Sequence, residues 1–324
     1  MKPVLPQNQP PSANLAPAGD VPRRKFGNTE VVVSALGLGG STFASASSKK
    51  EALRIVEEAV DGGITFMDNA WDYHDGRSEK WMGEALKGRR QQVFLMSKVC
   101  THGRDRNVAM RQLEDSLRRL KTDHLDLWQI HEVVYENDPD LHFAPGGAVE
   151  ALAAAKQQGK VRFIGFTGHK SPDLHRRMLA HKFPFDAVQM PLNGFDAGFR
   201  SFECEILPLL LKQGIAPIGM KSLNGTGKAV KAKVVTAEEA LRYAMSLPVS
   251  TTISGMDSLR ILRKNLRLAR SFVPMTTDEK MLFRRKCASF AADGRFELYK
   301  TSVYFDGAEG RRQHHFPTDD ELVA

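Results

Sequence analysis

The feature that most constrains this chain of 324 residues is a regular alternation of short apolar segments with segments of helical periodicity. A buried strand followed by an amphipathic helix is the repeating unit of a parallel sheet covered by helices. After an N-terminal hairpin the sequence contains eight such units, and eight is the number at which a parallel sheet closes into a barrel. The predicted fold is therefore an α/β structure, a (β/α)8 TIM barrel.

The predicted strands are Ala35–Gly40, Ile64–Met67, Val93–Ser97, Leu125–Ile130, Val161–Phe166, Ala187–Met190, Ala216–Met220 and Thr251–Ser254. The predicted helices are Lys49–Asp61, Ser78–Leu86, Asn107–Leu120, Val149–Gln158, Pro172–Ala180, Glu203–Gln213, Ala237–Met245 and Leu259–Ala269. In the first helix Ala52, Ile55, Val56 and Ala59 recur on one side, which is the spacing of a helix that covers a core.

Three segments flank or extend this barrel, which is predicted to occupy residues 23–270. Residues 1–22 are rich in Pro, Ala and Asn, which indicates a disordered or surface N-terminal arm. Arg24–Val33 predicts a β-hairpin that turns at Gly27-Asn28. Residues 271–324 are predicted to form a C-terminal extension over or around the barrel. It begins with a helix, Thr277–Ala291, and continues into a polar and aromatic stretch.

Composition narrows the class of protein. The formal net charge is +8, but the basic residues are dispersed and no recognised nucleic-acid motif is present, so we expect no nucleic-acid partner. The cysteines Cys100, Cys204 and Cys287 contain no CxxC pair, which supports neither a disulfide framework nor a thiolate metal site. No apolar run approaches the roughly 20 residues of a membrane span. We expect a cytoplasmic protein without a membrane partner, and whether a targeting signal preceded residue 1 stays open.

Polar residues lie where three consecutive apolar strands end. Asp68 closes a strand in the frame FMDNAWDY, and Tyr73 follows in the next loop. Lys98 ends the frame FLMSK, and His131 ends the frame DLWQIH. The carboxyl ends of all the strands of a parallel barrel meet at one mouth, where active sites of such barrels lie. The spacing therefore predicts that these four side chains, the tetrad, form one site.

Each tetrad residue also has an ordinary structural interpretation. Asp68 would cap a loop, Tyr73 would anchor it, Lys98 would be solvated, and His131 would be a core histidine. Four residue types in this order at successive strand ends favour the functional interpretation for the set.

The order of the tetrad in these three frames resembles the aldo-keto reductase family. The similarity runs from about Arg24 to about Ala269. Members of that family are (β/α)8 barrels that reduce carbonyl compounds with a nicotinamide cofactor. The resemblance implies an NAD(P)(H)-dependent oxidoreductase that reduces aldehydes or ketones to alcohols by hydride transfer, with a small-molecule carbonyl compound as substrate.

The resemblance also implies a role for each tetrad residue. Tyr73 would be the general acid, although an unperturbed phenol has a pKa near 10. The Lys98 ammonium is expected to lower that pKa, because a neighbouring positive charge favours the phenolate. Asp68 would hold Lys98, and His131 would orient and polarise the carbonyl oxygen.

The cofactor residues implied by the resemblance follow the strand ends around the barrel. They are Gly39, Gly40, Ser41, Asp68, Thr167, Gly168, His169, Gln189, Met220, Lys221, Ser222, Leu223, Gly225, Ser254, Gly255, Met256, Asp257 and Asn265. Two departures stand out. Thr167-Gly168-His169 replaces the Ser-Asn of many members, and Met220 stands where many have an aromatic residue that stacks on the nicotinamide.

The expected cofactor is NADP, with NAD as the alternative. Ile261 aligns with the arginine that commonly holds the 2′-phosphate of NADP, while Arg260 and Arg263 lie close to it in sequence. Asp257 would instead suit the free ribose hydroxyl of NAD.

Two other classes of function stay open. One is a cofactor-binding regulatory subunit with little turnover. The other is a metal-dependent barrel hydrolase, but its histidine and acidic ligands are not found at enough strand ends, so no metal is expected.

The substrate pocket would be shaped by Trp71, the connection Glu132–Gly147 and the aromatic residues of the C-terminal extension. These residues suggest an apolar or ring-bearing carbonyl compound as the substrate. A monomer or weak homo-oligomer is expected.

Overall fold

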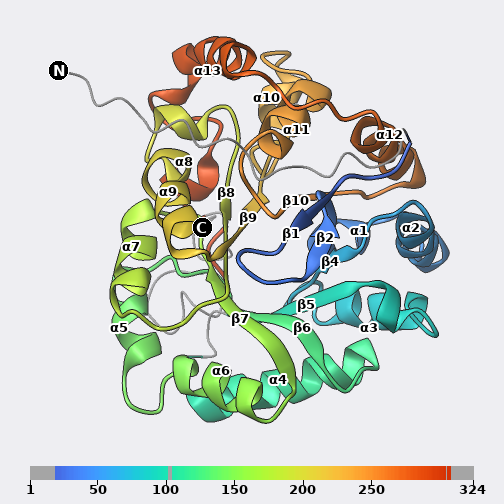
Figure 1. The fold of residues 1–324 in the computed structure, drawn as a ribbon, viewed down its shortest axis with the longest axis vertical. Coiled ribbons are helices and arrows are strands. Elements are labelled where there is room, and N and C mark those ends of the chain that lie inside the picture. Colours follow the sequence, from blue (N-terminus) through green and yellow to red (C-terminus); the bar gives the residue numbers. More distant parts are fainter. Residues whose placement is uncertain (1–18, 101–103, 304, 308–324) are drawn as a thin grey trace, which may run out of the picture.

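The computed structural model describes residues 19–100, 104–303 and 305–307. Their eight parallel strands close into a barrel with the order β10-β3-β4-β5-β6-β7-β8-β9 (Figure 1), which confirms the predicted TIM barrel. The strands are β3 Leu36–Gly39, β4 Phe66–Asp68, β5 Phe94–Val99, β6 Leu125–Ile130, β7 Val161–Thr167, β8 Ala187–Pro191, β9 Ala216–Met220 and β10 Thr251–Ser254.

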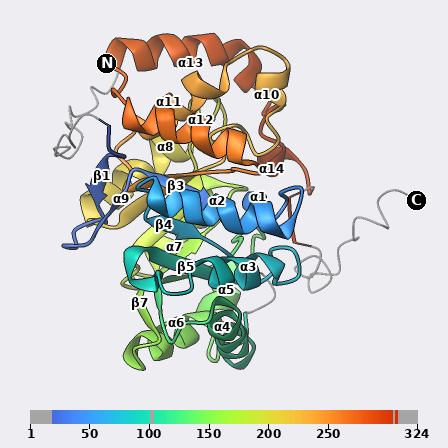
Figure 2. The same ribbon diagram turned by 90° about the vertical axis from the view of Figure 1, so that its right-hand side faces the viewer.

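Helices surround the barrel (Figures 1 and 2). They are α1 Gly40–Phe43, α2 Lys49–Asp61, α3 Arg77–Ala85, α4 Arg106–Leu120, α5 Asp138–Phe143, α6 Ala148–Gln157, α7 Pro172–Ala180, α8 Phe202–Glu205, α9 Leu207–Gln213, α10 Lys228–Lys231, α11 Ala237–Met245, α12 Leu259–Arg270, α13 Thr277–Ala291 and α14 Leu298–Thr301. Two short 3-10 turns lie at η1 Arg90–Gln92 and η2 Asp196–Gly198. None of the helices in the described part of the chain has the length and apolar character needed to span a bilayer.

The predicted hairpin is present, with β1 Arg23–Lys25 antiparallel to β2 Val32–Ser34. It carries the buried side chain of Phe26, whose ring centroid lies 4.8 Å from that of Phe94 and 5.3 Å from that of Phe163. Phe94 is the first residue of β5, so these rings fill the N-terminal end of the barrel interior. The turn requires glycine at Gly27, which has a φ of +57° and whose Cβ would lie 2.7 Å from the Gly214 carbonyl oxygen.

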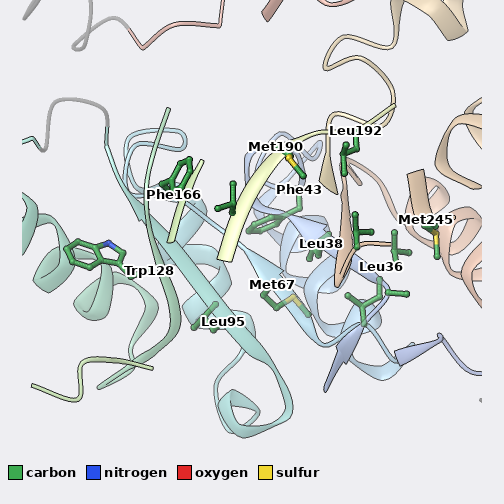
Figure 3. Packing of buried hydrophobic residues seen from close by; sticks show 14 of the residues in the cluster. Leu36, Leu38, Phe43, Met67, Leu95, Trp128, Phe166, Met190, Leu192 and Met245 are labelled. Carbon is green, nitrogen blue, oxygen red and sulfur yellow. The ribbon is translucent and has the colours of Figure 1, made fainter. Parts of the chain in front are cut away.

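Side chains of each strand alternate between two cores. Leu36, Leu38, Met67 and Leu95 belong to the core between the barrel and its helices (Figure 3). Phe66 and Phe94 belong to the second cluster, inside the barrel. Because the side-chain period of a strand is two, residues two and four positions after these phenylalanines also face the interior, one layer nearer the mouth.

Two predicted segments differ from the structure. The connection Glu132–Gly147, expected to be a polar loop, contains helix α5. The single helix expected over Glu203–Gln213 is broken into α8 and α9, because Pro208 occupies the first turn of α9. Proline has no N–H to donate to the preceding turn and clashes with it, so the helix restarts there.

The chain termini lie only partly within the described residues. Residues 1–18 of the predicted arm are outside them, while Val21 is buried and the Pro22 carbonyl accepts a hydrogen bond of 2.7 Å from Ala35 N. The C-terminal extension begins with α13, as predicted, and its Phe283 ring packs 5.0 Å from Tyr243 of α11. Figure 2 shows α13 on the outer side of the helical layer.

Candidate active site

The alternation of side chains along the strands places the tetrad residues inside the barrel, near its mouth. Asp68 lies two residues after Phe66 in β4, and Lys98 lies four residues after Phe94 in β5, so both face the interior above the phenyl layer. His131 follows β6 by one residue and continues the alternation of Leu127, which is an interior residue. The structure thus brings the predicted residues together, with Tyr73 reaching the same place from the loop after β4.

Lys98 is the centre of the hydrogen-bond network. Its Nζ donates to Asp68 Oδ1 at 2.9 Å, to the Asn69 carbonyl at 2.8 Å and lies 3.3 Å from the Tyr73 hydroxyl. Lys98 and Asp68 are both almost completely buried. The other oxygen of Asp68 accepts a hydrogen bond of 2.8 Å from Gln189 Nε2 at the mouth end of β8. All three ammonium donors are therefore in use, which fixes the Lys98 charge beside the phenol.

His131 also contacts Tyr73. The two ring centroids are 5.5 Å apart in an edge-to-face arrangement. His131 Nδ1 is 3.3 Å from Asp72 Oδ1, and His131 Nε2 is 3.9 Å from Glu132 Oε1. Burial acts to raise the pKa of Asp72, but the neighbouring His131 outweighs it and lowers the pKa below its usual value.

The structure corrects the expected direction of the Tyr73 pKa. Burial of the hydroxyl raises this pKa well above its ordinary value, and the charges of Asp68, Asp72 and Glu132 raise it further. The Lys98 ammonium does not reverse this, because its charge is paired with Asp68. Tyr73 is therefore held as the neutral phenol, which is the form that donates a proton.

The tetrad opens into a cavity of about 470 Å³. Most of the predicted cofactor residues line it together with the tetrad, namely Gly39, Ser41, Asp68, Thr167, His169, Gln189, Met220, Lys221, Ser222, Leu223, Gly225, Ser254, Gly255 and Asp257. Four predicted residues are not in the lining. An added Cβ on Gly40 or Gly168 would lie within 2.5 Å of a backbone oxygen, so both glycines serve packing. Met256 is buried, and Asn265 reaches the cavity only through its 3.1 Å hydrogen bond to Ser254.

Four further residues line the cavity that the sequence did not identify, namely Thr42, Thr226, Gly227 and Ile253. Glu132 and Phe305 also line it, and they belong to the connection and to the aromatic extension that the sequence predicted to shape the substrate pocket. Trp71, in contrast, does not line the cavity. Its Nε1 lies 3.3 Å from Asp115 Oδ2, and the Arg119 guanidinium lies 5.0 Å from its ring, so its contacts lie toward α4.

A buried oxygen atom without a hydrogen-bond partner indicates what kind of ligand group the cavity would bind. Gln189 Oε1 is buried and has no hydrogen-bond partner among the described residues, while the Nε2 of the same amide is committed to Asp68. A buried acceptor without a donor is costly, and a primary amide N–H would satisfy it. The carboxamide of a nicotinamide ring supplies such a donor. The described residues contain no cluster of three or more His, Cys, Asp or Glu side chains that would hold a metal ion.

The opposite end of the cavity lies at the N-terminus of α12 and is rich in carboxylates. Asp257 lines the cavity, and Glu51 Oε1 lies 3.3 Å from Leu259 N in the first turn of α12. Arg263 Nε and Nη2 each donate a hydrogen bond of 2.9 Å to one carboxylate oxygen of Glu58. Arg263, one of the two arginines that lie close in sequence to the aligned position Ile261, is thus already paired.

Comparisons with known proteins identify the family of the chain. The family model for the aldo/keto reductase family matches residues 35–234, more than half of the chain. The uncharacterized oxidoreductase YqkF of Bacillus subtilis is 27% identical over 291 residues, which cover 76% of this chain and 90% of that protein. The methylglyoxal reductase YeaE of Escherichia coli is 31% identical over 183 residues, or 56% and 61% of the two chains.

Solved structures share the fold. The holo form of aldo-keto reductase AKR11C1 from Bacillus halodurans superposes with a TM-score of 0.69 at 24% identity, covering 85% of this chain and 99% of that one. An aldo/keto reductase from Klebsiella pneumoniae, solved with NADP and acetate, has a TM-score of 0.66 at 21% identity and covers 82% and 95%.

Proposed function

We propose that this protein, which belongs to the aldo-keto reductase family, reduces aldehydes or ketones to alcohols with a hydride from a nicotinamide cofactor. The observation that carries the proposal is the buried Lys98 ammonium, which bridges Asp68 and the Tyr73 hydroxyl at the wall of the cavity. A phenol beside a fixed ammonium suits proton donation to a developing alkoxide.

In this proposal Tyr73 is the proton donor. The substrate carbonyl oxygen accepts a hydrogen bond from the Tyr73 hydroxyl, and His131, whose ring packs edge-to-face with that of Tyr73, helps to orient the carbonyl group. When bound, the cofactor supplies the hydride to the carbonyl carbon. Tyr73 then transfers its proton to the alkoxide oxygen, which is a far stronger base than the phenolate that remains. The raised pKa keeps the donor fully protonated before the reaction.

Lys98 and Asp68 position the donor and stabilise its conjugate base. The Lys98 ammonium, 3.3 Å from the phenol oxygen, offsets the negative charge that Tyr73 acquires. Asp68 accepts a hydrogen bond of 2.9 Å from that ammonium, and Gln189 Nε2 donates a hydrogen bond of 2.8 Å to the other oxygen of Asp68 and so holds the carboxylate in place. Preorganised charges of this kind act without the cost of reorganising solvent.

For the cofactor, Gln189 Oε1 would accept from the carboxamide and the Met220 thioether would cover a face of the ring. The hydroxyls of Ser222 and Ser254 line the cavity between the tetrad and α12 and would hold the phosphates. Two observations bear on the choice of cofactor. The Klebsiella relative was solved with NADP, which supports NADP(H). The carboxylates of Asp257 and Glu51 at the α12 end favour NAD(H), whose free ribose hydroxyls donate to acids.

Fluorescence titration with NADPH and NADH, paired with reduction of 4-nitrobenzaldehyde, tests the proposal. We expect binding of at least one cofactor and steady-state turnover of the aldehyde. Failure to bind either cofactor would overturn the proposal. Tight binding without turnover across a panel of aldehydes and ketones would instead support a regulatory subunit that retains the cofactor.

A further inference from the structure

Lys221 places a second ammonium in the cavity. The residue directly follows Met220 at the end of β9 and adopts a φ of +54°, which turns the chain at the mouth. Its Nζ lies 4.8 Å from the ring centroid of Phe305 and 5.4 Å from that of Tyr299, both in the C-terminal extension. The ammonium is therefore held against two aromatic rings at the cavity wall.

Unlike Lys98, this ammonium has no ion-pair partner among the described residues. Lys98 is matched by Asp68 at 2.9 Å, whereas no described carboxylate comes within 4.0 Å of Lys221 Nζ. Burial lowers the pKa of Lys221 to about 8, and the more distant Glu132 acts in the opposite direction. Lys221 is half-buried, so its ammonium loses part of its hydration without gaining a counter-charge, and an anion bound in the cavity would offset that loss.

The ring contacts of the Lys221 ammonium lie toward the C-terminal extension. Phe305 and Tyr299 belong to this extension, and Phe305 lines the cavity together with Lys221. The sequence predicts that the aromatic residues of this extension shape the substrate pocket. These contacts favour a group of the substrate as the ligand of the ammonium, although the backbone of Lys221 lies in the segment expected to run along the cofactor.

The backbone of Lys221 is fixed by buried polar contacts. Its carbonyl accepts hydrogen bonds from Asn224 N at 2.9 Å and from Asn193 Nδ2 at 3.4 Å. Asn193 also donates to the Tyr299 hydroxyl at 2.9 Å, so one amide side chain ties the lysine to an aromatic ring beneath its ammonium. Such a preorganised cation loses little conformational freedom when it binds an anion.

We propose that Lys221 binds an anionic group of the substrate, so that the protein prefers aldehydes or ketones that carry a carboxylate or phosphate. This inference rests on the proposed reductase function, because it concerns a substrate of the same cavity. Glu132 lines the same cavity, but its carboxylate lies 3.9 Å from His131 Nε2 and forms no ion pair with the Lys221 ammonium.

The test compares two substrates that differ in charge at one position, 4-carboxybenzaldehyde and methyl 4-formylbenzoate. The variant Lys221→Met keeps the apolar stem of the side chain against Phe305 and removes the charge. We expect kcat/KM for the carboxylate to fall by about 10- to 100-fold, the range of a charge-assisted hydrogen bond. The ratio of kcat/KM for the carboxylate to that for the ester should fall by a similar factor, because an effect on cofactor binding would act on both substrates and cancel in the ratio. Lys221→Arg should restore most of this ratio.

Lys228→Met is the matched control, because Lys228 is an exposed lysine on the adjoining helix α10 and its loss changes the net charge equally. A further readout is the pH dependence of kcat/KM, which reports the free form of the site. With the carboxylate it should decline as Lys221 loses its proton above pH of about 8, and with the ester this decline should be absent. Calorimetric binding of 4-(hydroxymethyl)benzoate to the cofactor complex should weaken in Lys221→Met by the same factor.

Two results would overturn the inference while leaving the reductase function intact. One is equal loss of kcat/KM for both aldehydes in Lys221→Met. The other is weaker binding of NADPH or NADH with an unchanged substrate preference, which would assign the ammonium to the cofactor diphosphate. If the wild-type protein turned over neither aldehyde with either cofactor, the proposed function would fail and the inference with it.

Discussion

At the scale of single residues, the site depends on one buried ion pair. The sequence identified Asp68, Tyr73, Lys98 and His131 because each ends or follows an apolar strand, and period-two alternation then determines which way they face. The lowered Tyr73 pKa expected from the sequence was wrong. Burial raises this pKa first, and the charges of Asp68, Asp72 and Glu132 raise it further, so it depends on how the loops after β4 and β6 fold. Phe305 belongs to the aromatic extension that the sequence predicted to shape the pocket, but no strand-end pattern marked it individually.

Asp68→Asn should destabilise the protein strongly. The substitution leaves the buried Lys98 ammonium without its counter-charge, and breaking a buried pair in this way costs about 3–5 kcal/mol. Urea denaturation measures the free energy of unfolding. Asp61→Asn is the control, because the Asp61–Arg89 pair is exposed and should contribute less than about 1 kcal/mol. Equal effects of the two substitutions would show that the Lys98 charge is solvated.

At the scale of elements, the local sequence pattern predicted helix bounds correctly where a helix is long or amphipathic. The bounds of α2, α7, α11 and α13 agree with those predicted from apolar spacing and capping residues. The short helices α5 and α14 were missed, because their stability comes from distant partners. Asp138 at the start of α5 accepts from Val134 N at 2.9 Å and from Arg104 Nε at 2.8 Å. The break before α9 was predictable in principle, since Pro208 marks it.

The C-terminal segment around α14 is anchored by a completely buried lysine. Lys300 Nζ lies 2.6 Å from Asp196 Oδ1 and 3.2 Å from Glu297 Oε2, and donates to the Phe199 carbonyl at 2.7 Å. Burial raises the pKa of both carboxyl groups, and the Lys300 charge opposes that rise. This anchor holds Tyr299 in place and lies just before Phe305, so it supports the wall against which Lys221 packs.

Lys300→Met should release this segment. Without the ammonium, two buried carboxylates face each other, and we expect a loss of about 3–5 kcal/mol in the free energy of unfolding. Hydrogen exchange should show faster exchange in residues 293–303 than in the barrel strands, and KM should rise more than kcat falls. Exchange that increased uniformly across the barrel would argue against a local anchor. Lys231→Met, on the surface of α10, is the control and should change neither the unfolding free energy nor the exchange rates.

At the scale of the whole molecule, the closed barrel separates two apolar cores. The outer core fixes the helices, and the phenylalanine layer inside the barrel fills its base and leaves the mouth for polar chemistry. Eight strand–helix units in the sequence were enough to predict this arrangement, because closure follows from their number and order. The volume and charge of the cavity were not predictable, since they depend on loops and on the C-terminal segment.

Buried neutral histidines should make the molecule sensitive to acid. Burial lowers the pKa of His142 to about 4, and those of His169 and His175 to about 3. Because the folded-state pKa lies below the unfolded value of about 6.5, the unfolded state takes up the proton first as pH falls. The stability contributed by each histidine is complete above pH of about 6.5 and declines below it, by roughly 2 kcal/mol at pH 5.

The variant His142→Leu isolates this effect. The buried carboxyl groups of Glu79, Asp196, Glu203 and Glu297 have raised pKa values and act in the opposite direction, so wild type and variant must be compared at each pH. We expect the unfolding free energy of wild type to fall relative to that of the variant by about 1 kcal/mol per pH unit between pH 6 and 4. A difference that stayed constant with pH would show that His142 titrates alike in both states.

The central claim is that Tyr73 donates the proton in a hydride-transfer reaction, and Tyr73→Phe tests it most directly. The phenyl ring keeps its edge-to-face packing on His131 and loses only the hydroxyl that lies 3.3 Å from Lys98. Cofactor binding and aldehyde reduction are measured on the same samples of both proteins. We predict a loss in kcat of about 10²- to 10⁴-fold, the usual contribution of a general acid, with the cofactor Kd unchanged within about twofold. A variant that binds cofactor and retains kcat within tenfold of wild type would contradict the account.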